Sequence, residues 1–261
     1  MRKKISIFVK TYNSEDIIEK CLKNILWADE LLIVDSYSTD RTLDICRRYT
    51  SNIIQHEYIG NASQCNWTIP QLKHEWVLLI DSDEVVNPAL KKSIEYILEN
   101  DNKEYNGYYI FRRNHFLGKC INFCGERKDK SIRFFRRDKG RCEDKKVHAE
   151  KIVEGRAGYI NKGYLEHYQQ RNIVKYFEKL NRYTSWAAEE MYKNKKRPHW
   201  YHFTIRPAFK FIQTFFLQLG FLDGIHGFFW CILSSIYVFT KYLKLWEMYQ
   251  LQISTKGYKN L

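Results

Sequence analysis

Three acidic residues, Asp81, Asp83 and Glu84, directly follow residues 76–80, a hydrophobic run that no charge interrupts. Five consecutive apolar residues rich in Val, Leu and Ile indicate a strand buried on both faces, as in a parallel sheet covered by helices. Open α/β sheets bind ligands at the carboxyl ends of such strands. Two carboxylates there suit a hard divalent cation that also holds a diphosphate. Taken alone, the same triplet fits a loop of solvated acids better than it fits a metal site.

Other segments repeat the order strand, polar loop, helix. The sequence predicts strands at residues 5–9, 30–34 and 53–54 and helices at residues 17–25 and 42–46. Asn13 or Ser14 is placed to cap the first of these helices. Successive units of this kind argue for a right-handed βαβ arrangement and a parallel sheet. We therefore expect the loops that carry Thr11, Asp35 and Asp81 to gather along one edge of one sheet.

Four motifs in sequence order resemble the nucleotide-sugar half of family 2 glycosyltransferases, which have the GT-A fold. They are Thr11-Tyr12-Asn13-x-Glu15, Val34-Asp35-Ser36-x-Ser38-Thr39-Asp40-x-Thr42, Gln64-x-Asn66 and Leu79-Ile80-Asp81-Ser82-Asp83-Glu84. Later segments are similar in order and spacing to the bacterial lipopolysaccharide-core β-1,4-glucosyltransferase group, among them Phe116-Leu117-Gly118-Lys119, residues 133–137, Val147-His148 and residues 165–168, 179–183 and 220–224. The resemblance covers nearly the whole chain. It implies an α/β protein of the GT-A fold, Rossmann-like with a mostly parallel central sheet flanked by helices, and a C-terminal helical membrane-associating extension.

The resemblance also implies an activity. It predicts an inverting glycosyltransferase that moves a hexose, with glucose favoured, from a UDP-sugar to a hydroxyl of a lipid-linked glycan such as the lipopolysaccharide or lipooligosaccharide core. Transfer of another sugar in capsule or other surface polysaccharide assembly is the alternative within this class. A non-catalytic membrane protein or a nucleic-acid-binding protein is the alternative of another class, because the chain is basic and aromatic. The acid-tipped strand ends favour the enzyme.

By resemblance, Thr11 and Tyr12 face the base and Asp35 accepts from the uracil N–H. The residues expected around the nucleotide-sugar are Thr11, Tyr12, Asn13, Glu15, Asp35, Gln64, Asn66, Asp81, Ser82 and Arg133. A departing diphosphate gains negative charge, which Mg²⁺ or Mn²⁺ would neutralise. The expected metal ligands are Asp83, Asp81 and His167, and Arg133 or Arg136 is expected to reach the phosphates.

An inverting transfer also needs a carboxylate that takes the proton of the acceptor hydroxyl. In the resembled group a Glu often directly follows a Val-His pair, whereas Ala149 follows His148 here. We therefore expect Glu150 as the first candidate for the base and Asp144 as the second. Glu143 is a further rival, and His148 is expected in the acceptor loop.

The last third of the chain differs in composition from the rest. The formal charge is +13, and from residue 169 onward there are 14 Lys and Arg against 5 Asp and Glu, with 22 of the 42 aromatic residues. The most apolar stretch, residues 227–240, is shorter than the roughly 20 residues of a spanning helix. The helical pattern at residues 205–219 fits a membrane interface or a core hairpin. The basic residues 193–197 and the neighbouring Trp200 and Tyr201 favour the interface.

We predict a division near Tyr168. Residues 1–168 would form the catalytic domain, with a nucleotide-sugar half at 1–106 and an acceptor half at 107–168, and residues 169–261 would contact a membrane or another subunit. Seven cysteines without a paired framework and no secretory signal indicate the cytoplasm, at the inner face of the cytoplasmic membrane. The expected partners are a nucleotide-sugar donor, a lipid-linked glycan acceptor and an anionic membrane, with self-association through the last helices left open and no nucleic acid.

Overall fold

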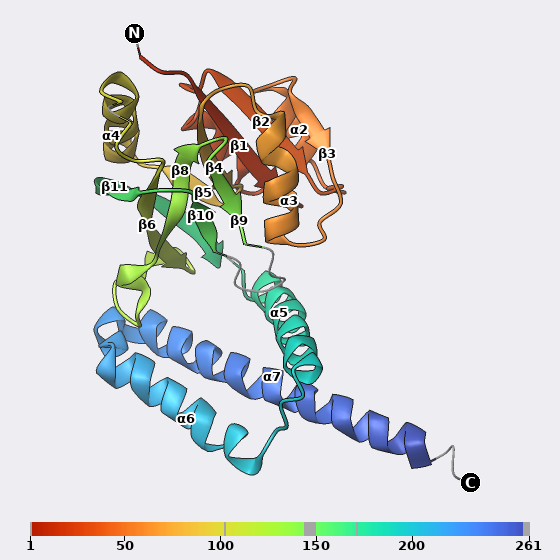
Figure 1. Ribbon diagram of the computed structural model, residues 1–261. Coiled ribbons are helices and arrows are strands. Elements are labelled where there is room, and N and C mark those ends of the chain that lie inside the picture. The colour runs from red at the N-terminus through yellow and green to blue at the C-terminus, as the bar shows by residue number, and fades with distance from the viewer. Residues whose placement is uncertain (1, 102, 144–149, 171, 258–261) are drawn as a thin grey trace. The chain divides into compact units, whose positions relative to one another are not determined.

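The computed structural model describes residues 2–101, 103–143, 150–170 and 172–257. The chain divides into two compact units (Figure 1). The first consists of Met1–Asn114 and Lys128–Gln169, and the second of His115–Arg127 and Gln170–Leu261. The predicted acceptor half, residues 107–168, is therefore divided between the two units, because residues 115–127 belong to the second unit.

The first half of the catalytic unit is a parallel sheet in the order β3-β2-β1-β4. Its strands are β1 (Ile5–Thr11), β2 (Glu30–Asp35), β3 (Ile53–Gln55) and β4 (Trp76–Asp81). These strands confirm the four predicted from hydrophobic runs. All seven residues of β1 are buried, which explains why its sequence does not alternate between apolar and polar positions.

Helices cover both faces of this sheet (Figure 1). They are α1 (Ile18–Lys23), α2 (Thr42–Arg47), α3 (Asn61–Thr68) and α4 (Pro88–Glu99). Ile7 and Val9 of β1 pack with α1, α2 and α4, while Phe8, which points to the other face, packs with α3. The predicted cap of the first helix is wrong: Ile17 occupies the N-cap position, and no side chain caps α1. Asn13 and Ser14 lie before it and bind neighbouring loops instead.

The sheet continues beyond β4 in the order β8-β6-β11-β5, and β4 pairs with β8 in the antiparallel direction. The added strands are β5 (Glu84–Val86), β6 (Gly107–Phe116), β8 (Lys130–Arg136) and β11 (Ala157–Gln170). Two short strands, β9 (Gly140–Cys142) and β10 (Lys151–Val153), form a separate antiparallel pair. Because β5 lies antiparallel to β11, His167 comes opposite Glu84, one residue beyond Asp83. Pairing within the sheet thus brings two distant acid- and imidazole-bearing segments together.

The second unit is helical. It contains α5 (Ile173–Lys193), α6 (Ile205–Ile212), a π-helical turn (Gln213–Leu217) and α7 (Gly224–Gly257). The segment 115–127 includes β7 (Lys119–Cys120), which pairs with the end of β6. Its Phe116, Ile121 and Cys124 share one apolar cluster with Cys231 and Leu233 of α7. This segment is therefore part of the hydrophobic core of the helical unit.

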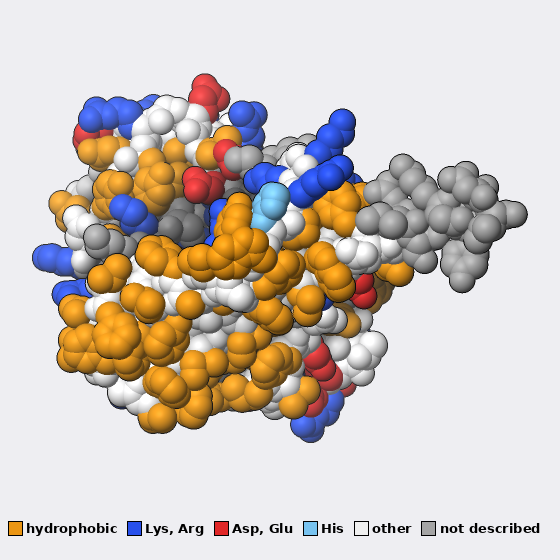
Figure 2. Space-filling model, turned by 90° about the horizontal axis from the view of Figure 1, so that it is seen from below, with side chains coloured by type: hydrophobic (Ala, Val, Ile, Leu, Met, Phe, Trp, Pro, Cys, Tyr) orange, Lys and Arg blue, Asp and Glu red, His pale blue; other side chains and the backbone are white. Residues whose placement is uncertain are grey.

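The apolar helix near the carboxyl end is longer than its most apolar stretch. Residues 227–240 were predicted to be too short to span a bilayer, whereas the continuous helical segment Gly220–Leu251 has 32 residues and is long and apolar enough to do so by length and composition. His226 and Lys241 bound the apolar run without ending the helix, because neither residue type breaks helical geometry. Only 17% of its most apolar window is buried. Figure 2 shows hydrophobic side chains gathered over the face that α6 and α7 form.

Candidate functional site

The carboxyl ends of β2, β1 and β4 lie side by side. In the register of the parallel strands, Asp35 of β2 comes opposite Thr11 of β1, and Asp81 of β4 comes opposite the adjacent Lys10. The predicted gathering of the three loops along one edge of the sheet is therefore confirmed. Two of the acids and the first polar loop meet where open α/β sheets bind ligands.

Asp35 organises the loop that follows β2. Its side chain is fully buried and accepts hydrogen bonds from the backbone N–H of Ser38 and from Nε2 of Gln55, each at 3.0 Å. Ser36, next along the chain, accepts from Nε2 of the buried Gln64 at 2.8 Å. These bonds hold the β2 loop against α3 without using every acceptor position of the Asp35 carboxylate.

The first polar loop contains residues with two different roles. Tyr12 is exposed, whereas the side-chain hydroxyl oxygen of Thr11 is buried and has no hydrogen-bond partner among the described residues. Asn13 adopts a left-handed backbone conformation, with φ of 45°, and accepts from the backbone N–H of Thr39 at 2.8 Å. Glu15 accepts from the backbone N–H of Arg41 at 3.1 Å. Asn13 and Glu15 thus join the first two loops to each other.

Two other predicted nucleotide ligands have structural partners. Both polar atoms of the Asn66 side chain bind the backbone of Cys142 in β9, at 2.9 Å and 2.8 Å. Ser82 contacts the hydroxyl of Ser14 at 2.8 Å. Asn66 therefore ties α3 to the β9–β10 hairpin, and Ser82 ties the β4 loop to the first loop, which differs from the ligand contacts expected of them.

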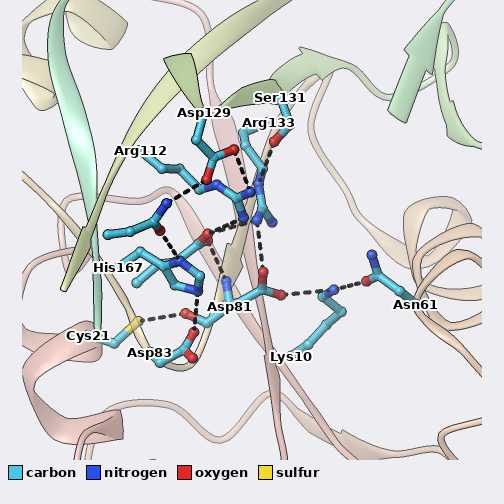
Figure 3. Close-up of polar contacts among 12 residues, drawn as sticks. Lys10, Cys21, Asn61, Asp81, Asp83, Arg112, Asp129, Ser131, Arg133 and His167 are labelled. Carbon is cyan, nitrogen blue, oxygen red and sulfur yellow. Dashed lines mark hydrogen bonds and ion pairs between the residues drawn. The ribbon is translucent and has the colours of Figure 1, made fainter. Parts of the chain in front are cut away.

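The centre of the site is a network of buried ion pairs around Asp81 (Figure 3). Asp81 Oδ1 lies 2.9 Å from Nζ of Lys10, and Oδ2 lies 2.8 Å from Nη2 of Arg133. The same guanidinium nitrogen lies 2.7 Å from Oε1 of Glu84. Glu84 is fully buried and Arg133 is 1% exposed, whereas the side chain of Asp81 remains 30% exposed, so Arg133 and Glu84 form the part of the network that is removed from water. The ammonium of Lys10 also donates to Asn61.

Charge decides the protonation of this network. Burial would raise the pKa of Asp81, but Lys10 and Arg133 outweigh it and hold that pKa well below its usual range. Lys151 of β10 is a third cation in the same region. Burial lowers the pKa of Lys151 to about 8, and repulsion from Arg133 and Lys10 contributes to this shift. Three basic groups, Lys10, Arg133 and Lys151, lie with two carboxylates, Asp81 and Glu84, so the region favours a further anion.

Asp81, which was predicted to be a metal ligand, is paired with two cations in this structure. Both of its carboxylate oxygens are taken by cations, Lys10 on one side and Arg133 on the other. Its place in the site is to position those two cations. Arg136 is also directed elsewhere, because its guanidinium pairs with Glu75 and Asp101.

Asp83 and His167 face one another, with Oδ1 of Asp83 3.6 Å from Nε2 of His167 (Figure 3). On the other side of the ring, Nδ1 lies 2.6 Å from the amide oxygen of Asn114. The amide nitrogen of Asn114 donates to Asp129 at 2.8 Å, which turns the amide oxygen toward the ring. Nδ1 therefore donates its hydrogen to the amide oxygen of Asn114, and Nε2 faces the carboxylate of Asp83.

This donor set fits a divalent cation. A carboxylate oxygen and an imidazole nitrogen face the same point, and the imidazole donates its other N–H to an amide oxygen, as metal-binding histidines commonly do. In the described ranges, no group of three or more His, Cys, Asp or Glu side chains is arranged to hold a metal. A cation held by Asp83 and His167 would complete its shell with oxygens from substrate or water.

One buried nitrogen near this pair lacks an acceptor. Nη1 of Arg133 is inaccessible to water and has no hydrogen-bond partner in the described part of the chain. A buried guanidinium N–H without an acceptor is costly, and phosphate oxygens match its planar donors. The observation favours an anionic ligand with several oxygens next to Asp81.

Two candidates for the base, Glu143 and Glu150, flank the segment that connects β9 to β10. The backbone N–H of Glu143 donates to the carbonyl of Glu150 at 2.9 Å, so the two acids end the hairpin on opposite strands. The side chain of Glu150 is exposed. Asp144, His148 and Ala149 lie outside the described residues. The hairpin adjoins the main site through Asn66 and Lys151, which places both described acids near its rim.

Several residues of the network were given no role from the sequence: Lys10, Glu84, Arg112, Asn114, Asp129 and Lys151. A charged residue at the end of an otherwise apolar strand, as Lys10 is, gives a signal that could have been used. On β6, Arg112 and Asn114 are two residues apart and therefore share a face, and both bind Asp129 at 2.8 Å. Nothing local distinguishes this pair from the polar residues of an ordinary edge strand.

Comparisons with known proteins agree with the fold. A model of glycosyl transferase family 2 matches residues 6–150. Over 254 residues the chain is 26% identical to LpsC, a lipopolysaccharide core biosynthesis glycosyltransferase of Rhizobium meliloti (strain 1021), covering 95% of this chain and 94% of that protein. It is 27% identical over 270 residues to an uncharacterized glycosyltransferase of Rickettsia typhi, covering 98% of this chain and 90% of the relative.

A solved structure shares the architecture. The mannosyltransferase PcManGT from Pyrobaculum calidifontis, in complex with GDP-Man and Mn²⁺, superposes with a TM-score of 0.50 at 17% identity, covering 91% of this chain and 74% of that chain. Together with the match to the family, the mixed sheet flanked by helices is a GT-A type fold.

Proposed function

The chain belongs to glycosyl transferase family 2 and is a transferase enzyme, and we propose that it moves a hexose from a UDP-sugar to a hydroxyl of a lipid-linked glycan. Glucose is the favoured hexose, and the lipopolysaccharide or lipooligosaccharide core is the favoured acceptor. The relative named for lipopolysaccharide core biosynthesis, alike over nearly the whole chain, supports the acceptor class. Another sugar in capsule or other surface polysaccharide assembly is the second candidate within this activity.

The observation that carries the proposal is the junction of Asp83, His167 and Arg133. The first two fit a divalent cation, and the buried Nη1 of Arg133 lacks an acceptor that a diphosphate oxygen can provide. Both features lie in one hydrogen-bonded network at the carboxyl ends of β1 and β4. A Mg²⁺ or Mn²⁺ ion at this point would stabilise the charge of the departing diphosphate.

The protein groups divide the remaining work. The bond between the anomeric carbon and the diphosphate breaks while the acceptor oxygen bonds to the same carbon, and a carboxylate receives the acceptor proton. The first candidate for the base that receives this proton is Glu150, and the second is Asp144. Arg133 and Lys10 remain cationic throughout. Against the effect of burial, Glu84 and Asp81 raise the pKa of Arg133, and Asp81 raises the pKa of Lys10. Thr11, Tyr12, Asp35 and Gln64 are proposed to border the nucleoside.

The proposed location is the inner face of the cytoplasmic membrane. The helical unit supplies basic and exposed aromatic residues, which suit an anionic surface. A peripheral enzyme there would reach a lipid-linked acceptor without leaving the membrane.

Titration calorimetry of the full-length protein with UDP, in the presence and absence of Mn²⁺, tests the nucleotide and metal together. We expect Mn²⁺ to strengthen UDP binding about tenfold or more, and Asp83→Asn to abolish the increase while preserving the metal-free affinity. Glu99→Gln, at an exposed acid on α4, is the matched control and should behave like wild type. Absence of UDP binding under both conditions would contradict the proposal and favour a non-catalytic membrane protein.

A panel of radiolabelled UDP-sugars with a rough-type lipid extract identifies the donor. UDP-glucose should label the lipid fraction most rapidly. Labelling from a different sugar would replace glucose while leaving the reaction class intact.

A further inference from the structure

The helical unit exposes an unusual amount of large apolar side chain. Of the 28 large hydrophobic residues with exposed side chains in the described part of the protein, 17 lie between Trp200 and Leu251. Figure 2 shows such side chains collected on one face. Contiguous exposed apolar patches on soluble monomers are normally small, so this face requires a partner.

The exposed apolar residues follow the periodicity of the two helices. On α6, Ile205, Phe209 and Ile212 are four and three residues apart and therefore line one side of the helix, and all three are exposed. On α7, the corresponding stripe is formed by residues Ile225, Phe229, Phe239, Leu243 and Trp246. The hydrogen bond between Arg206 and Tyr242 and the packing of Phe211 against Phe228 show that the helices run antiparallel. The two stripes belong to one helical hairpin.

A groove of about 500 Å³ lies between these helices. Its walls include Ala208, Phe211 and Ile212 of α6 and Ile232, Ile236 and Phe239 of α7. The volume lies in the range of small-molecule pockets, and the walls lack charged side chains. Since Ile212 and Phe239 belong to both the groove and the exposed stripes, the groove opens within the apolar face.

Basic residues occupy the other side of the hairpin. Arg206 and Lys210 are four residues apart on α6, away from the stripe of Ile205, Phe209 and Ile212. Arg206 and Lys241 both lie 5.4 Å from the ring centre of Tyr242. Two cations thus flank one aromatic ring at the end of the hairpin.

The described part of the chain offers these cations no acidic partner. Burial lowers the pKa of Lys241, and repulsion from Arg206, Lys196 and Lys210 lowers it further. Among the described residues, none of the four forms an ion pair with an acidic side chain. A cluster of four positive groups, of which Lys210 and Lys241 are partly buried, favours an anionic partner, since the described residues supply no counter-ion.

We propose that the α6–α7 hairpin lies in the interface of an anionic phospholipid bilayer, with its apolar stripes among the acyl chains and Arg206, Lys210 and Lys241 at the level of the phosphates. The groove receives one acyl chain of that leaflet. Basic residues on the polar side of an amphipathic helix, with aromatic residues on the other, are the pattern of interfacial membrane helices. The inference rests on and deepens the membrane contact proposed above.

Charge argues against a second copy of the chain as the partner. An isologous contact through this face would bring two sets of uncompensated cations together in a protein of formal charge +13. An anionic bilayer supplies both an apolar interior and the missing negative charge. The bilayer therefore matches the two sides of the hairpin at once.

Co-sedimentation of the full-length protein with extruded vesicles tests the inference. Vesicles of phosphatidylglycerol should bind the protein at least about tenfold more tightly than vesicles of phosphatidylcholine at physiological ionic strength. Phe209→Glu should weaken binding to both lipids, and Phe239→Glu on α7 provides an independent second variant. Tyr96→Glu, at an exposed aromatic of α4, is the matched control and should bind as wild type does.

Two further variants separate the charges from the groove. Arg206→Gln combined with Lys210→Gln should weaken binding to phosphatidylglycerol roughly 30-fold, since each basic residue near such a surface contributes about a factor of five. Binding to phosphatidylcholine should not change. Ala208→Trp, which fills the groove, should weaken binding to both lipids several-fold. If Ala208→Trp binds both kinds of vesicle as wild type does, the proposal that the groove receives an acyl chain is wrong.

Light scattering in vesicle-free buffer and UDP titration complete the test. Wild-type dimers that Phe209→Glu converts to monomers, together with no vesicle binding, would overturn the inference in favour of self-association. Vesicle binding that Phe209→Glu and Phe239→Glu leave intact would overturn it as well. Because the same sample is titrated with UDP, loss of vesicle binding alone refutes only the membrane hairpin, and loss of UDP binding alone refutes only the proposed transferase chemistry.

Discussion

The side chain of Asn114 sets the tautomer of His167. Its amide oxygen lies 2.6 Å from Nδ1 of the ring, and its nitrogen is held by Asp129 at 2.8 Å. The imidazole thus donates away from Asp83 and presents its other nitrogen to it. Asn114 of β6 thus orients His167 of β11 toward Asp83, which lies between β4 and β5.

Asn114→Ala should weaken Mn²⁺ binding in the presence of UDP by about 10- to 100-fold, the usual effect of removing a hydrogen-bond partner of a ligating histidine. Calorimetric titration of Mn²⁺ measures this directly. Asn106→Ala is the control. It removes another side-chain amide of the catalytic unit, one that donates to the backbone carbonyl of Glu154, and should leave Mn²⁺ affinity unchanged. Equal Mn²⁺ affinities for all three proteins would contradict the role of His167.

Glu150→Gln should lower kcat for sugar transfer by about 10² to 10⁴-fold with little change in the KM of the donor, because the amide cannot accept the acceptor proton. Initial rates with the labelled donor give both parameters. Glu143→Gln, at the facing position of the hairpin, is the matched comparison and should retain most of kcat. The opposite ranking of these two variants would transfer the role of base to Glu143.

Arg133→Met should destabilise the protein by about 3–5 kcal/mol, since it leaves the carboxylates of Asp81 and Glu84 buried with one cation fewer. Urea unfolding followed by circular dichroism measures the change. Arg156→Met removes an exposed arginine, 73% accessible, that pairs with Glu104 at 3.6 Å, and should cost about 1 kcal/mol or less. Similar losses for the two variants would show that burial of the ion pairs does not matter.

The stability of the sheet should depend on pH through Asp101. Burial would raise its pKa, but hydrogen bonds from the backbone of Lys103, from Arg136 and from Trp76 outweigh this and lower it. Its contribution, about 2 kcal/mol for charge-assisted hydrogen bonds, is present above the unfolded pKa of about 3.9 and disappears as the pH falls through the lower folded value. Urea unfolding should therefore separate wild type from Asp101→Asn at pH near 6, and the difference should shrink as the pH falls below the unfolded value. A difference that does not change with pH would contradict this account.

Gly163→Ala should destabilise the protein by about 2 kcal/mol or more. Gly163 has φ of +97°, and a Cβ there would lie 2.1 Å from the backbone nitrogen of Leu90, so strain and a clash act together. Gly118→Ala is the control, because Gly118 has φ of +86° but no atom within 4 Å of an added Cβ. It should cost about 1 kcal/mol, from backbone strain alone. Equal losses in thermal unfolding would show that the approach of β11 to α4 can relax.

The sequence predicts the parallel half of the sheet well because each strand is a continuous apolar run that ends in a polar loop. The alignment of Thr11 with Asp35 and of Lys10 with Asp81 then follows from parallel pairing. The partners of individual side chains do not follow. Asn66 has a motif position that suggests a ligand contact, yet two hydrogen bonds commit it to the backbone of Cys142, 76 residues away.

The antiparallel half is harder to predict for the same reason. Arg133 and Arg136 flank two aromatic residues on β8, but one enters the Asp81 network while the other pairs with Glu75 and Asp101. Only the neighbours on adjacent strands distinguish them. Similarly, the apolar run at residues 227–240 underestimates the length of α7, because the helix continues through polar residues that are compatible with helical geometry.

The shared cluster of Phe116, Ile121 and Cys124 with α7 means that the polypeptide changes unit three times, at residues 114–115, 127–128 and 169–170. A protein shortened after Gln169 would therefore retain residues 115–127 but lose α7, and the apolar side chains of this segment would become exposed to water. Hydrogen bonds from the backbone N–H groups of Asn122 and Phe123 to the Asp223 carboxylate would be lost with it. Removing the whole helical unit also requires replacing residues 115–127 with a short turn. A single truncation therefore cannot separate the two units.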